Sequence, residues 1–150
     1  MKTHCKHYLP GFRGTCLTVC GLYVFLSSSL FIRGLMPSMA QFQVPAQTLA
    51  SPHYADALLW VYVHMAVIGL MLGVIGWYAT ESRLQRVFAR LMLFVHIAYF
   101  YLDLRSSDSP WGNALYKGPA SMVPVLIGML MCLLFAHLSI CPAINHSEAS

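Results

Sequence analysis

His64 and His96 are the residues best suited to chemistry, because each lies inside an apolar run, where an ionisable side chain is costly. His64 lies seven residues after the start of the run 57–79, and His96 lies seven residues before Asp103. At a helical rise of about 1.5 Å per residue, each lies about 10 Å from one end of its helix. Two helices joined by a short turn run antiparallel, so the sequence predicts that both histidines lie at one depth.

A level pair of histidines has three uses, and the sequence leaves all three open. Two imidazoles facing each other across a helix bundle are the axial ligands that a b-type haem requires, so haem b is one candidate cofactor. A proton relay would use the same pair, and Tyr99 and Asp103 extend the polar face of His96 towards the helix end. In the third use each ring bonds a neighbouring carbonyl or hydroxyl, which is the structural role that the sequence favours.

Signals for other chemistry are weak. Cys16 and Cys20 share a helical face but form no CxxC, so we interpret them as small apolar residues of a span. No metal-ligand cluster, Walker loop, HExxH or GxSxG motif occurs in the chain. Asp56 and Asp103 fall at the ends of apolar runs, which leaves no carboxylate inside a span for a proton-coupled exchanger. The sequence therefore favours a non-enzymatic protein, with a small transporter as an alternative.

The elements that position these residues are membrane-spanning helices. The chain has 58% hydrophobic and 9% charged residues, whereas about a quarter of the residues in soluble domains are charged. The basic residues are few and dispersed, which argues against binding nucleic acid. Apolar runs of about 20 residues predict an all-α, four-helix transmembrane bundle forming one domain over residues 1–150. The predicted spans are residues 15–35, 57–79, 85–104 and 120–140.

The first apolar run and the connection after it each allow two interpretations. The basic start followed by an apolar run resembles a signal peptide, but the run exceeds the usual 7–15 residues and ends at Arg33. We therefore expect a retained first span. The proline-rich connection 36–54 is too broken for one helix, and we expect a surface loop with Met39, Phe42 and Val44 resting on the headgroups.

The Lys and Arg distribution predicts the orientation in the membrane. Four spans place both termini and residues 80–90 on one side, which carries six Lys or Arg residues against three on the other. Both termini are therefore expected in the cytoplasm. The six are Lys2, Lys6, Arg13, Arg83, Arg86 and Arg90, and the three are Arg33, Arg105 and Lys117.

The second span carries a face of small residues at helical spacing: Ala66, Gly69, Gly73 and Gly76. Gly69 and Gly73 form a GxxxG pair, which lets another helix approach closely. That helix can belong to the same subunit, to a second copy of the chain or to another membrane protein. Besides the lipid bilayer, the partners expected from the sequence are a homo-oligomer or another membrane protein.

Three topological features carry a resemblance: the basic start up to Arg13, the arginine-rich hairpin 83–90 and the short outer loop 106–117. With these features the chain resembles the uncharacterised small multi-pass inner-membrane proteins of Gram-negative bacteria. The resemblance implies a location in the bacterial inner (cytoplasmic) membrane. It transfers no functional residue.

Overall fold

The computed structural model describes residues 10–141, and this part of the chain is helical without a β-strand. Its long helices are α1 (Phe12–Arg33), α4 (Pro52–Tyr78), α5 (Ser82–Ser106) and α6 (Met122–Ile140). All four are long and apolar enough to cross a membrane, α6 together with the 3-10 turn η2 (Pro119–Ser121) before it. The predicted spans are thus confirmed as helices that are compatible with a multi-pass membrane protein.

The helix ends differ from the prediction by a few residues, for local reasons. α1 ends at Arg33 because Gly34 adopts a φ of +83°, a left-handed conformation that suits glycine and turns the chain. α4 begins at Pro52, since the first turn of a helix tolerates the missing amide of proline. α5 continues to Ser106, two residues beyond the predicted span, and Asp103 lies in its last turn.

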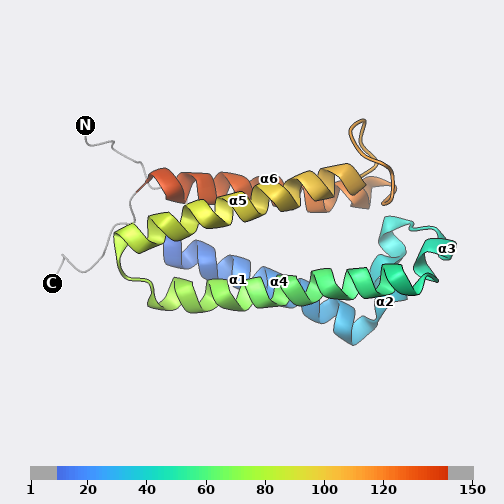
Figure 1. The fold of residues 1–150 in the computed structure, drawn as a ribbon, viewed down its shortest axis with the longest axis horizontal. Coiled ribbons are helices and arrows are strands. Elements are labelled where there is room, and N and C mark those ends of the chain that lie inside the picture. Colours follow the sequence, from blue (N-terminus) through green and yellow to red (C-terminus); the bar gives the residue numbers. More distant parts are fainter. Residues whose placement is uncertain (1–9, 142–150) are drawn as a thin grey trace.

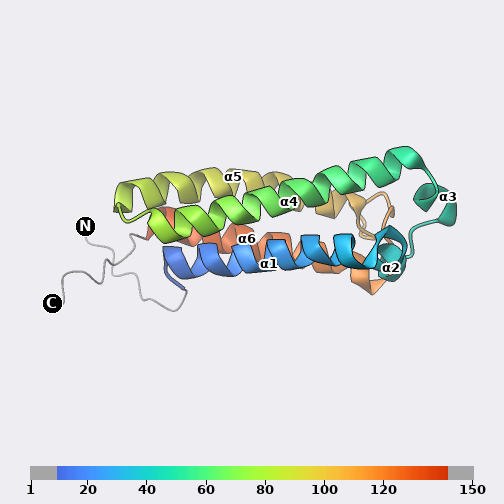
Figure 2. The ribbon, with the colours of Figure 1, turned by 90° about the horizontal axis from the view of Figure 1, so that it is seen from below.

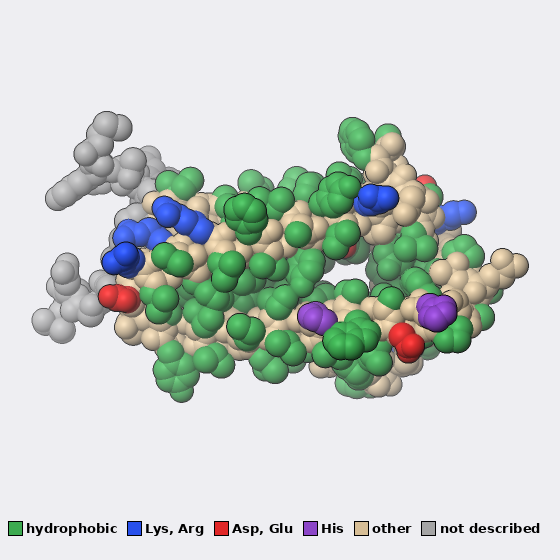
Figure 3. All heavy atoms as spheres, in the orientation of Figure 1, with side chains coloured by type: hydrophobic (Ala, Val, Ile, Leu, Met, Phe, Trp, Pro, Cys, Tyr) green, Lys and Arg blue, Asp and Glu red, His purple; other side chains and the backbone are tan. Residues whose placement is uncertain are grey.

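The long helices form two layers, α1 with α4 and α5 with α6 (Figure 1). Figure 2 shows the same layers from below, with all four helix axes running along the long dimension of the molecule. In Figure 3 hydrophobic side chains cover the middle of the face that α4 and α5 form, and Lys and Arg gather towards its two ends. This distribution suits an apolar slab between two aqueous phases.

The layers meet tightly near the end where α1 begins and α6 finishes. Buried side chains from all four long helices form one apolar core there, and the Arg13 guanidinium lies 4.0 Å above the Trp77 ring. This half of the molecule, here called the closed half, holds the layers together. Its buried members are Phe12, Cys16, Val19, Tyr23, Leu72, Ala89, Met92, Met131, Phe135 and Leu138.

The opposite half is capped by the connection between α1 and α4. This connection folds as α2 (Leu35–Met39), η1 (Ala40–Phe42) and α3 (Ala46–Leu49). Met39 is 2% exposed and Val44 8%, and both pack against Leu58 of α4. The expectation that these two side chains rest on the headgroups is therefore wrong, because the protein itself offers them an apolar cluster.

The small-residue face of α4 packs inside the molecule, against α1. A Cβ added at Gly69 would lie 2.9 Å from the Tyr23 Cβ, and one at Gly76 would lie 2.5 Å from the Cys16 Cβ. Gly73 meets the same helix, since a Cβ there would lie 2.8 Å from a sulfur atom of α1. These glycines let two backbones approach closely within one subunit.

The sulfur atom beside Gly73 belongs to Cys20, which faces α4 together with Cys16 one turn earlier. Both thiols are free, so the two cysteines serve as small packing residues, as the sequence predicted. Ala66, the fourth member of the predicted face, is half-buried on α4.

Candidate functional site

A cavity of about 480 Å³ lies between the two layers, in the half of the molecule opposite the closed half. All four long helices and the connection 34–51 line it. Apolar side chains form much of the wall, but hydroxyl, imidazole and carboxylate groups face inward as well. The polar groups with most bearing on function are Tyr23, Tyr62, His96, Tyr99, Asp103 and Tyr116.

The floor of the cavity is a hydrogen-bonded pair from opposite layers. The Tyr23 hydroxyl lies 2.7 Å from His96 Nε2, and His96 Nδ1 lies 2.7 Å from the Met92 carbonyl oxygen. A carbonyl only accepts, so Nδ1 carries a proton and donates it. A charged ring would be costly at 1% exposure, so the ring is neutral and Nε2 accepts from the Tyr23 hydroxyl. The ring also stacks on Phe135 at 4.9 Å between centroids. Both ring nitrogens of His96 are therefore engaged.

His64 lies elsewhere. Its side chain is exposed, its Nδ1 bonds the Trp60 carbonyl oxygen at 2.8 Å, and its ring lies 5.4 Å from the Trp60 ring. His64 lies five positions before Gly69, so the two side chains point in directions about 140° apart around the helix axis. Because Gly69 faces α1, His64 faces away from the bundle.

The structure thus does not bring His64 and His96 together. One ring is 1% exposed inside the bundle, and the other is exposed on its outer surface. The two imidazoles do not flank a common space in which a haem iron or a shared proton could lie. Haem ligation by this pair and a relay through both rings stay predictions without geometric support.

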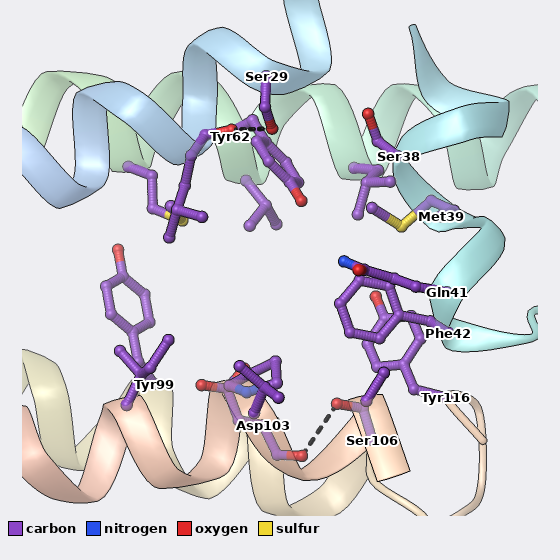
Figure 4. Close-up of a pocket in the computed structure, with 18 of the residues that line it drawn as sticks. Ser29, Ser38, Met39, Gln41, Phe42, Tyr62, Tyr99, Asp103, Ser106 and Tyr116 are labelled. Carbon is purple, nitrogen blue, oxygen red and sulfur yellow. Dashed lines mark hydrogen bonds between the residues drawn. The ribbon is translucent and has the colours of Figure 1, made fainter. Parts of the chain in front are cut away.

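Asp103 lines the wall that α5 forms. Its side chain is half-buried, and Oδ2 lies 3.5 Å from the position that a Cβ on Gly128 of α6 would take. Within residues 10–141 no cation and no hydrogen-bond donor is bonded to this carboxylate. The sequence placed Asp103 at the end of an apolar run, and Asp103 lies in the last turn of α5, three residues before Ser106. Its side chain lines the cavity (Figure 4), which the sequence did not predict.

The polar face predicted on the third span is confirmed. His96, Tyr99 and Asp103 all line the cavity, and Ser106 continues the row one turn further. In Figure 4 the hydroxyls of Tyr99 and Tyr62 point into the cavity from opposite layers. A face set by helical spacing alone was predictable from the sequence, because residues three or four apart stay together on any helix.

The other elements contribute cavity residues that were not predicted from the sequence. Tyr23 lies near the middle of α1, and a buried tyrosine hydroxyl at such a depth needs a partner, so this signal was present in the sequence. From their places in the sequence, Tyr62 near the start of the second span and Tyr116 in the loop 105–119 are typical of interfacial aromatic residues. No local pattern places these two beside α5.

The end of the cavity under α2 and η1 is covered by two connections that touch. The Lys117 amide donates to the Phe42 carbonyl oxygen at 2.9 Å, and the Phe42 and Tyr116 rings lie 5.2 Å apart. Burial raises the pKa of Tyr116 above its ordinary value, so its hydroxyl stays protonated near neutral pH. The connection between α5 and α6 and the connection between α1 and α4 therefore together close this end of the cavity.

One side of the cavity is open. Figure 3 shows an opening between α4 and α5 on the face towards the viewer, in the half that carries the capping connections. With the four helices in a membrane, this opening faces lipid. A molecule dissolved in the bilayer would reach the cavity without crossing the cap.

No family model, curated protein or solved structure matches this chain. Across the described residues, no three His, Cys, Asp or Glu side chains cluster as a metal site would require.

Proposed function

We propose that this chain is a multi-pass membrane protein that binds a small amphipathic molecule taken from the lipid phase, without changing it chemically. One observation carries the proposal: the cavity is closed at both ends, open at the side and lined by polar groups. Its volume falls within the range of about 300–1,000 Å³ that is typical of small-molecule sites.

Two functions considered from the sequence relate to this proposal. Contacts with a second copy or another membrane protein lose their best candidate surface, because the glycine face of α4 is occupied by α1. A small transporter gains support from the inward-facing Asp103, since transporters use ionisable groups inside the membrane to recognise their substrates. Binding in the cavity is the step that a carrier and a non-transporting binding protein share.

The proposed location is the bacterial inner membrane, with both termini in the cytoplasm. Reporter fusions test this orientation: alkaline phosphatase is active outside, and green fluorescent protein fluoresces inside. We expect phosphatase activity after Ser51 and Ser107 and fluorescence after Thr80, because α4 and α5 cross in opposite directions. Equal behaviour of the Ser51 and Thr80 fusions would contradict the four-span topology. A fusion after Ser147, which should also fluoresce, lies outside the described residues.

Binding is tested with three anthracene amphiphiles that differ only in an uncharged hydroxyl, a trimethylammonium or a sulfonate head. The protein is held in phosphatidylcholine nanodiscs, and anthracene fluorescence is compared with that in empty nanodiscs. We expect saturable binding of at least one probe. Leu26→Trp should weaken that binding at least tenfold, because Leu26 lines the cavity and a larger ring there reduces its volume.

Leu17→Trp is the matched control, since Leu17 lies on the same helix, is exposed and does not line the cavity. Its affinity for the probe should stay within twofold of the unsubstituted protein. Absence of saturable binding for all three probes would overturn the proposed function, and so would an equal loss in the two variants.

A further inference from the structure

We propose that the molecule bound in the cavity is a lipophilic organic ammonium ion, and that Asp103 provides its counter-charge. This inference rests on the proposed function and specifies its ligand. It depends on three features of the cavity: a carboxylate without a partner, aromatic rings around it, and access from the lipid.

The first feature is the state of Asp103. Its carboxylate is half-buried between α5 and α6 and is bonded to no cation in the part of the chain that the structure describes. An ionised group removed from water is costly unless it is paired. A cation entering the cavity would supply this missing partner, so the carboxylate favours a positively charged ligand over a neutral one.

The second feature is the aromatic lining. Tyr62 and Tyr99 extend into the cavity from opposite layers, and Phe42 and Tyr116 lie together at its capped end (Figure 4). The faces of aromatic rings attract ammonium groups, and the attraction increases where water is excluded. A carboxylate among several rings is the chemistry that recognises alkylated amines.

The third feature concerns the size and route of the ligand. The cavity is far larger than an inorganic cation, and among the described residues Asp103 is the one acid that lines it. Its side opening lies on the apolar face that α4 and α5 form, so the ligand must be soluble in lipid. An amine that carries an apolar ring or chain meets both requirements.

The other ionisable groups that line the cavity do not cancel this preference. His96 is 1% exposed, and a charged ring would be costly at such a depth without an acidic partner, so the ring is neutral. Its two nitrogens are bonded to the Met92 carbonyl and the Tyr23 hydroxyl. Arg33 also lines the cavity, but its side chain is exposed at the end of α1, where water and lipid phosphates screen its charge. The half-buried charge is therefore negative.

The experiment compares the three anthracene probes on the intact protein in uncharged nanodiscs. We expect the trimethylammonium probe to bind at least tenfold more tightly than the hydroxyl probe. Asp103→Asn should weaken binding of the ammonium probe at least tenfold and leave the hydroxyl probe within twofold, because the substitution removes the charge and keeps the shape. Asp103→Glu should retain the preference.

Asp56→Asn is the matched control, because Asp56 is the exposed acid near the start of α4 and does not line the cavity. Equal affinities for ammonium and hydroxyl probes would overturn the inference while the proposed function stands. Tightest binding of the sulfonate probe would overturn it too and would point to Arg33. If no probe binds saturably, both the inference and the proposed function fail.

Discussion

Replacing Gly76 with isoleucine will lower the free energy of unfolding by about 3 kcal/mol, near the upper end of what overpacking costs. A Cβ at this position lies 2.5 Å from the Cys16 Cβ, a separation that real Cβ atoms essentially never show. The clash involves atoms close to both backbones, so no side-chain rotation relieves it, and α1 and α4 must move apart. The loss is measured by denaturant unfolding in detergent micelles, followed by circular dichroism.

Gly21→Ile is the matched control for this prediction. Gly21 lies on α1, and a Cβ there meets nothing within 4 Å. We expect its free energy of unfolding to change by less than about 0.5 kcal/mol. If the glycine face of α4 formed a contact between subunits instead, Gly76→Ile would reduce the oligomer mass and leave the stability of the monomer unchanged.

Replacing His96 with alanine will lower the free energy of unfolding by about 2–3 kcal/mol. The substitution removes a fully buried ring that stacks on Phe135, and it leaves the Tyr23 hydroxyl without its partner. It also removes the hydrogen bond that joins the two layers at the floor of the cavity. Tyr23→Phe removes the same bond but keeps the packing, so we expect it to cost about 1 kcal/mol.

His64→Ala distinguishes this arrangement from a histidine pair. The His64 ring is exposed and bonds its own helix, so its removal should change the free energy of unfolding by less than about 0.5 kcal/mol. The absorption spectra of the same samples test the haem alternative. A Soret band in the unsubstituted protein that either histidine substitution abolishes would contradict the separate placement of the two rings.

The two halves of the molecule differ in packing: one is a closed apolar core, and the other encloses the cavity. In the closed half, glycines of α4 and a buried apolar core hold the layers in contact. In the other half, the layers separate around the cavity and are joined again by the cap, where Lys117 bonds Phe42. Substitutions in the closed half and at the floor of the cavity, such as His96→Ala, should change stability. Under the proposed function, those elsewhere along the cavity should change affinity for the ligand.

The sequence by itself determined the helices. Runs of about 20 apolar residues have one stable conformation in lipid, since a helix satisfies every backbone group internally. Gly34 and Pro52 then limit α1 and α4 through their own backbone preferences. Helical spacing also determined that His96, Tyr99 and Asp103 share one face, because this depends on one helix alone.

Only the tertiary structure decided which faces meet. Unlike α5, α4 carries no polar stripe along its sequence that would tell its inner side from its outer side. The glycines of α4 could pack against any helix, and their contact with α1 is what turns His64 outward. Tyr23 reaches His96 across 73 residues of chain, a contact that depends on how the two layers pack and that no local pattern encodes.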